Sequence, residues 1–216
     1  MMSRKVLITA AATAFALAGC RSEGDIVVEQ GVGISALRTT CPAVGVPDYT
    51  GNLTTFTREG ARTADAIDVT ASITNVRSTC DESGDQVYAT ATFDVLAQRR
   101  DNRGARTVTL PYYSVVMRGG SAVVAKRIGQ VTLNFADGEY RAQGTGTGAA
   151  WIDRAAATLP EDIRAQITRR RRAGEADAAV DPLTQPEVQA ALARASFELL
   201  VGFQLTQDQL RYNATR

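Results

Sequence analysis

The sequence predicts a mainly β domain of two antiparallel sheets, interrupted by two helices and followed by a third, short helix. Three observations support this fold class. Apolar and polar residues alternate over several stretches, as they do in strands with one buried face. Turn-forming residues separate these stretches at short intervals. After Trp151 the alternation stops, and patterns typical of helix starts take its place.

The first strands are predicted at residues 53–58, 67–74 and 87–95. In the second of these, apolar side chains recur at every other position, and the third repeats the pattern after a turn that contains Ser83 and Gly84. The short turn indicates that residues 67–74 and 87–95 form an antiparallel hairpin.

Residues 108–116 and 123–135 form the next predicted pair of strands. Pro111 places the first of them at a sheet edge or at a bulge, because proline cannot donate to the ladder. Two consecutive glycines at 119–120 predict a tight hairpin turn. Gly129 suggests a bulge or bend within the second strand.

A fifth strand is predicted at residues 139–147, and the glycine-rich stretch 144–148 is interpreted as a flexible exit from it. That stretch lacks the lysine and the spacing of a phosphate-binding loop. Several short strands separated by turns favour an antiparallel sandwich of the broad immunoglobulin-like or fibronectin-like kind. A small barrel is the alternative.

Residues 157–196 form a predicted insertion of two helices. Thr158 and Thr184 are each followed by a proline and by a glutamate three residues on, a pattern typical of capped helix starts. Residues 197–205 then alternate again, which indicates that the chain returns to a sheet. Thr206 and Gln209 predict a capping box at the start of a last short helix.

The N-terminal stretch has the features of an export signal with an acylation site. Arg4 and Lys5 precede an apolar run at residues 6–18 that is too short to span a bilayer, and Gly19 stands directly before Cys20. This stretch resembles the signal segment of bacterial lipoproteins, whose lipobox of Leu, small residues and Cys is matched by residues 17–20. An ordinary secretory signal with a chance cysteine, or a folded leader, is the alternative.

The resemblance implies that residues 1–19 are a removed signal peptide and that Cys20 carries a covalent lipid, the only cofactor expected. Residues 20–45 would then be the lipidated N-terminus and tether, and 46–216 the β-sandwich domain. Residues 26–28 and 34–37 could instead form short edge strands. Arg21, rather than Asp, follows the cysteine, which favours the periplasmic side of the outer membrane over that of the inner membrane.

Lipidation of Cys20 leaves Cys41 and Cys80 as an even pair in an oxidising compartment, which predicts a disulfide. The bridge would close a loop of about forty residues and restrict the unfolded chain by roughly 4 kcal/mol. Two free thiols are the alternative.

The composition excludes several function classes. The chain has no histidine, which removes the commonest general base and metal ligand. Its 24 basic and 23 acidic residues nearly balance, so no overall field attracts nucleic acid. No catalytic residues and no metal site are therefore predicted, and we do not expect an enzyme.

Two groups of residues are candidate contact sites. Four arginines at consecutive positions expected to be helical could bind an anionic partner or form a solvated helix end; they are Arg169, Arg170, Arg171 and Arg172. Four aromatic residues could line a ligand pocket or pack within the sheets; they are Tyr112, Tyr113, Tyr140 and Trp151.

The sequence therefore leads to two functional hypotheses. The first is a lipid-anchored, non-catalytic interaction module that docks on another envelope protein in the periplasm. The second is a periplasmic binding module for a small apolar, glycan or lipid ligand. A flat exposed apolar patch would favour docking, whereas a cavity with aromatic walls would favour ligand binding.

Overall fold

The computed structural model describes residues 36, 38–58 and 60–215. The leader, Cys20 and most of the predicted tether lie outside these residues. The chain divides into two compact units. The larger one, Ala36–Thr168 with Pro182–Arg216, contains all the strands and helices given below, and Arg169–Asp181 belongs to the other.

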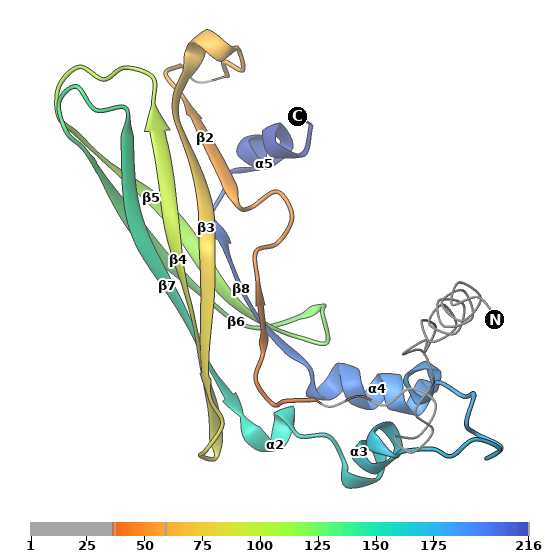
Figure 1. Ribbon diagram of the computed structural model, residues 1–216. Coiled ribbons are helices and arrows are strands. Elements are labelled where there is room, and N and C mark those ends of the chain that lie inside the picture. Colours follow the sequence, from red (N-terminus) through yellow and green to blue (C-terminus); the bar gives the residue numbers. More distant parts are fainter. Residues whose placement is uncertain (1–35, 37, 59, 216) are drawn as a thin grey trace, which may run out of the picture. The chain divides into compact units, whose positions relative to one another are not determined.

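The larger unit is mainly β and contains two four-stranded sheets (Figure 1). The first has the order β1-β8-β5-β6, in which β1 runs parallel to β8 and the other neighbours are antiparallel. Its strands are β1 (Ala43–Gly45), β5 (Arg106–Arg118), β6 (Ala122–Phe135) and β8 (Phe197–Phe203). The second sheet is antiparallel throughout, in the order β2-β3-β4-β7. Its strands are β2 (Asn52–Phe56), β3 (Ile67–Asp81), β4 (Gln86–Arg99) and β7 (Arg141–Asp153).

The predicted alternation corresponds to the buried faces of these strands. In β4 the apolar side chains at odd positions are buried from Val87 to Ala97, and Val201 and Leu199 of β8 are buried in the same core. Burial of one face of each strand supplies the hydrophobic free energy that holds the two sheets together.

The glycine-rich stretch of β7 lies within the strand, which corrects its interpretation as a flexible exit. Gly144, Gly146 and Gly148 pair with β4 and, being two residues apart, share one face. A Cβ at Gly144 would lie 2.6 Å from a methyl carbon of Val131, and one at Gly148 would lie 2.7 Å from Cβ of Ser114. These positions require glycine because β7 approaches the opposite sheet so closely that a Cβ would not fit.

Two aromatic rings occupy the space above these glycines. A Cβ at Gly146 would overlap the ring of Phe93, which packs edge-on against Tyr112 with ring centroids 5.1 Å apart. The Tyr112 hydroxyl donates to the carbonyl of Thr147 at 2.8 Å and therefore links β5 to β7. Tyr112 also covers Gly129, where the β5–β6 register is regular. The bulge predicted at Gly129 is wrong; the irregularity lies between Val116 and Met117.

Pro111 lies where the pairing of β5 with β8 ends. Its carbonyl accepts from the backbone N–H of Gln204, one residue beyond β8, and Tyr112 begins the register with that strand. The predicted sheet edge or bulge at Pro111 is wrong, because β5 lies between β8 and β6 and Pro111 pairs with Gln130 in regular register. The missing N–H of proline is tolerated because the ladder to β8 ends here.

The insertion between β7 and β8 is helical, as predicted. It contains α2 (Arg154–Ala157), α3 (Glu161–Thr168), the 3₁₀ helix η4 (Pro182–Thr184) and α4 (Pro186–Ala195). The chain also contains the 3₁₀ helix η3 (Ala64–Ala66) and ends with α5 (Gln207–Ala214).

One of the three predicted caps is confirmed. Thr206 and Gln209 form the capping box of α5. Thr158 instead ends α2 and donates its hydroxyl to the carbonyl of Arg154. Thr184 ends η4, and Gln185 precedes α4 without a side-chain cap. Proline at the first turn of α4 suffices to begin that helix.

Cys41 and Cys80 form the predicted disulfide, with their Cα atoms 6.1 Å apart. Thr39 and Thr40 donate hydroxyl hydrogen bonds to Glu82 nearby, and these bonds lower the pKa of that carboxyl, the bond from Thr40 having the largest effect. Ala43–Gly45 is strand β1, so the predicted tether of residues 20–45 overlaps the fold at its C-terminal end.

A buried arginine holds the loops at one end of the sheets. Arg99 is 1% exposed, and its guanidinium donates to four backbone carbonyls. They belong to the loop after β4 (Asn102 and Gly104) and to the loop after β6 (Ala136 and Glu139). These bonds compensate for burial of the charge, since a buried cation is tolerated only when it is fully hydrogen-bonded.

The substitution Gly146→Ala tests the close approach of β7. The ring of Phe93 is fully buried and cannot move away, so we expect the free energy of unfolding to fall by about 1–3 kcal/mol in urea denaturation. Gly84→Ala is the control, because the nearest atom to its Cβ is 3.9 Å away; we expect a change within about 0.5 kcal/mol. Equal effects of the two substitutions would contradict the close packing.

Candidate protein-interaction surface

The N-terminal half of β6, residues 122–128, is exposed along its whole length. Val123 is 63% exposed, and Val124 and Ile128 are each 57% exposed. In the other half of the same strand, Val131, Leu133 and Phe135 are buried. Strand β6 therefore contributes to the core with one half only and presents aliphatic side chains to solvent with the other.

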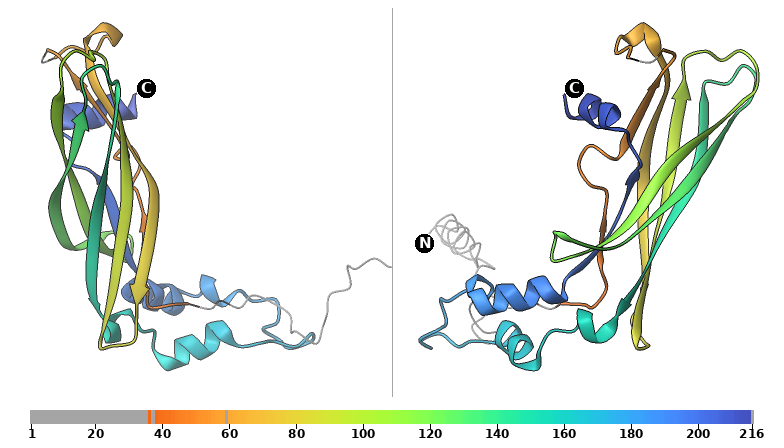
Figure 2. Two further views of the ribbon diagram at one scale, coloured as in Figure 1. Left: turned by 60° about the vertical axis from the view of Figure 1, so that its left-hand side comes forward. Right: turned by 180° about the vertical axis from the view of Figure 1, so that it is seen from behind.

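The exposure of this half follows from the course of the β5–β6 hairpin. Figures 1 and 2 show that the tip of this hairpin turns away from the end of the β3–β4 hairpin. The backbone N–H of Gly119 donates to the carbonyl of Ser196 at 3.0 Å, which fixes the tip beside the end of α4. A Cβ at Gly119 would lie 2.8 Å from the carbonyl oxygen of Ala193, so this approach requires glycine.

Two exposed aromatic side chains lie on the neighbouring β7 and β4. Trp151 is 52% exposed and is paired in register with Tyr88; the ring centroids are 4.7 Å apart. The guanidinium of Arg127 lies over the indole, 5.6 Å from its centroid. Arg127 thus joins the exposed half of β6 to the aromatic pair.

We call this region the β6–Trp151 surface. It comprises Tyr88, Val123, Val124, Lys126, Arg127, Ile128 and Trp151.

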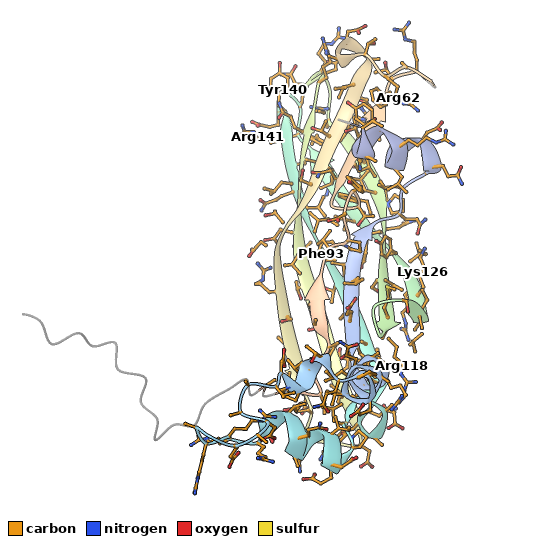
Figure 3. The ribbon with its side chains drawn as sticks, turned by 90° about the vertical axis from the view of Figure 1, so that its right-hand side faces the viewer. Arg62, Phe93, Arg118, Lys126, Tyr140 and Arg141 are labelled. Atoms are coloured by element: carbon orange, nitrogen blue, oxygen red, sulfur yellow. A yellow bond between two sulfur atoms is a disulfide. The ribbon has the colours of Figure 1, made fainter. Side chains whose placement is uncertain are left out.

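The charge of this surface is positive. Lys126 lies over the ring of Tyr113, with its Nζ 5.1 Å from the centroid. Figure 3 shows Lys126 at the margin of the molecule, away from Phe93. Within the described part of the chain, neither Lys126 nor Arg127 has a carboxylate within ion-pair distance. These two cations therefore remain available to an external anion.

The four consecutive arginines differ from one another in their surroundings. Helix α3 ends at Thr168, so they follow the helix, which corrects their placement at helical positions. Arg169 forms ion pairs with Glu175 at 2.7 Å and with Asp177 at 3.2 Å. Arg171 is buried and lies 3.5 Å from Asp177. Arg170 and Arg172 are exposed.

The four aromatic residues proposed as pocket walls do not meet. Tyr112 lies between the sheets, while the hydroxyl of Tyr113 lies 3.2 Å from that of Thr50. Tyr140 is exposed in the loop between β6 and β7, and Trp151 belongs to the β6–Trp151 surface.

Two concavities of the larger unit have no aromatic lining among the described residues. One, of about 650 Å³, lies on the outer face of the second sheet around Leu96 and Arg141. The other, of about 630 Å³, lies among α2, α3 and the segment that begins at Ala36. Three smaller concavities, of about 560, 440 and 370 Å³, each have one aromatic residue in their lining: Tyr212, Phe197 and Tyr140. The larger unit also presents exposed apolar side chains on β6.

The sequence contained a signal for this surface that the strand analysis missed. Val123 and Val124 are adjacent, which breaks the alternation, and Arg127 occupies an inward position in phase with Val131. An arginine at an inward position indicates that this half of the strand does not face a core. The aromatic pair was not predictable, because Tyr88 and Trp151 meet only through the β4–β7 register.

No family model, curated protein or solved structure matches this chain. None of the helices in the described part is long and apolar enough to cross a membrane. Among residues 36, 38–58 and 60–215, no three His, Cys, Asp or Glu side chains are grouped as a metal site.

The only tryptophan of the chain, Trp151, permits a direct test of this surface. We expect iodide to quench its fluorescence readily, because the indole is half exposed and lies beside a cation that attracts the anion. Arg127→Gln should lower quenching by iodide without lowering quenching by neutral acrylamide, whereas Arg103→Gln, a surface control, should change neither. Iodide quenching that is insensitive to Arg127 would contradict the described contact.

Proposed function

We propose that this protein is a lipid-anchored, non-catalytic interaction module of the bacterial cell envelope that docks on another envelope protein through the β6–Trp151 surface. The observation that carries the proposal is the exposure of aliphatic and cationic side chains along one half of β6, together with the contact of Arg127 from this strand with the exposed aromatic pair of β7 and β4. Exposed apolar groups of this kind, on a protein held at a membrane, are typical of interaction sites.

The composition of the surface supports a protein partner. Tryptophan, tyrosine and arginine are the residue types that contribute most to binding at protein interfaces. Trp151, Tyr88 and Arg127 provide one of each, and Trp151 contacts both of the others. Binding of a small ligand would instead favour an enclosed site with a few converging polar groups. The proposal therefore gives docking precedence over ligand binding.

The anchor in this proposal is the lipid on Cys20, at the periplasmic side of the outer membrane. The chain from Cys20 to Cys41 has twenty-one peptide links and could extend over roughly 70 Å at most. The disulfide to Cys80 would transmit any pull on this segment to β3. Arg170 and Arg172 are proposed as additional contacts to anionic groups, because their two neighbours are already paired with carboxylates.

We further propose that the two sheets form a sandwich of the broad immunoglobulin-like or fibronectin-like kind. The support is the number of strands in each sheet and the burial of their facing sides. In such a scaffold, rigid sheets carry a contact surface at an edge.

Site-specific photo-crosslinking in intact cells tests the docking proposal. A photoreactive benzophenone amino acid at position 128 or 151 should capture the same discrete protein. At position 96 it should not, although Leu96 is equally exposed, 51%, on the outer face of the second sheet. Trp151→Ala should lower the yield of the adduct at position 128 by about tenfold, as expected of a central contact. Absence of an adduct at both surface positions would refute docking.

Membrane fractionation tests the anchor. Cys20→Ser should move the protein from the membrane to the soluble periplasmic fraction, because stable attachment without a spanning helix requires the acyl chains. The paired control Cys41→Ser with Cys80→Ser removes the disulfide but should leave membrane attachment unchanged. Unchanged membrane residence of the Cys20→Ser protein would exclude the lipid anchor.

A further inference from the structure

We infer that the N-terminal half of β6 binds its partner by strand addition, and that the partner segment carries two consecutive acidic residues flanked by aliphatic ones. The inference rests on the proposed function, because it specifies how docking occurs at that same surface. The probe that tests it is a peptide, so the mode of binding is tested separately from docking in the cell.

The first argument is the position of β6 in its sheet. The strand is the last in the order β1-β8-β5-β6, so it pairs with β5 on one side only. Residues 122–128 pair with residues 113–118 of β5 in a register that is regular except for the bulge beside Val116. An ordered edge strand presents backbone N–H and C=O groups at the spacing that a further strand requires.

The second argument is that the rest of this edge is occupied. Gly144 of β7 lies close to the carbonyl oxygen of Thr132 and the side chain of Val131, so β7 covers the C-terminal half of β6. Toward the hairpin tip, the described contact between β6 and β7 is made by side chains, the guanidinium of Arg127 lying over the ring of Trp151. No described strand pairs with residues 122–128 on the side away from β5, so this half of the edge can accept an added strand.

The third argument is the pattern of side chains along the open half. Lys126 pairs with Val115 and Arg127 with the buried Ser114, so the two cations point to opposite faces of the sheet. A partner strand therefore needs an acidic residue at both of the facing positions, because opposite charges stabilise cross-strand neighbours and like charges destabilise them. Val124 and Ile128, on either side, favour aliphatic residues at the flanking positions.

The same charges argue against a second copy of this chain as the occupant. Antiparallel pairing of two β6 edges about their cations would set Lys126 of one copy against Arg127 of the other. Natural edge strands use such charges to prevent self-association. A partner with acidic residues in the matching positions avoids this repulsion. The two cations therefore favour an acidic partner strand and disfavour pairing with a second copy of this chain.

The test uses the full mature chain and a fluorescein-labelled decapeptide with a central Glu-Glu pair between valines and isoleucines. We expect saturable binding by fluorescence polarisation. A Lys-Lys version of the peptide should bind at least about tenfold more weakly, since like charges would oppose each other. The protein variant Lys126→Glu with Arg127→Glu should reverse this preference, whereas the control Arg103→Glu with Arg141→Glu, at two exposed positions outside the β6–Trp151 surface, should preserve it.

Backbone methylation separates strand addition from contact through side chains alone. Two versions of the Glu-Glu peptide are N-methylated, one at the odd and one at the even amides. Because alternate amides of a strand face opposite edges, only one version blocks the hydrogen bonds to β6. That version should bind at least about tenfold more weakly, and the other should retain binding. Equal binding of both would overturn strand addition while leaving docking intact. No saturable binding of the Glu-Glu peptide, or a dimer of the free protein in sedimentation, would also overturn the inference.

Discussion

The close approach of β7 to the opposite sheet is the constraint on which the rest of the structure depends. Three glycines two residues apart remove the side chains that would hold the sheets apart, and Phe93 with Tyr112 fills the space above them. The hydroxyl of Tyr112 bonds to the backbone of β7, so a polar contact fixes an approach that dispersion and burial favour. Without these small residues the two inner faces could not meet at this edge.

The same constraint explains why a surface remains open. β7 covers β6 at Val131 and Thr132, and the loops beyond are tied by the buried guanidinium of Arg99. At the other end of β6, the hairpin tip is held by Ser196 beside α4 instead of by β7. The sheets are therefore fixed at both ends, and the strand between these fixed points exposes Val124 and Ile128 along an unpaired edge.

Local patterns in the sequence predicted much of this fold. Alternation located most strands, the cysteine count predicted the Cys41–Cys80 bridge, and the pair Thr206 and Gln209 predicted the start of α5. The errors concern contacts between distant residues: Gly146 was assigned to a flexible stretch because its partner ring, that of Phe93, is 53 positions away. Likewise, the surface around Trp151 depends on the register between β4 and β7 and on the β5–β6 hairpin turning away from the β3–β4 hairpin. No local sequence pattern encodes either feature.

Amide hydrogen exchange along β6 tests most directly whether a partner docks at this strand. It is measured on the purified protein and on the protein in its native envelope. In the purified protein, amides of the N-terminal half that face away from β5 should exchange much faster than those around Leu133, because no strand in the described part of the chain pairs with that half on this side. In the envelope they should slow markedly as a partner occupies the edge. Equal exchange in the two settings would contradict docking at this surface.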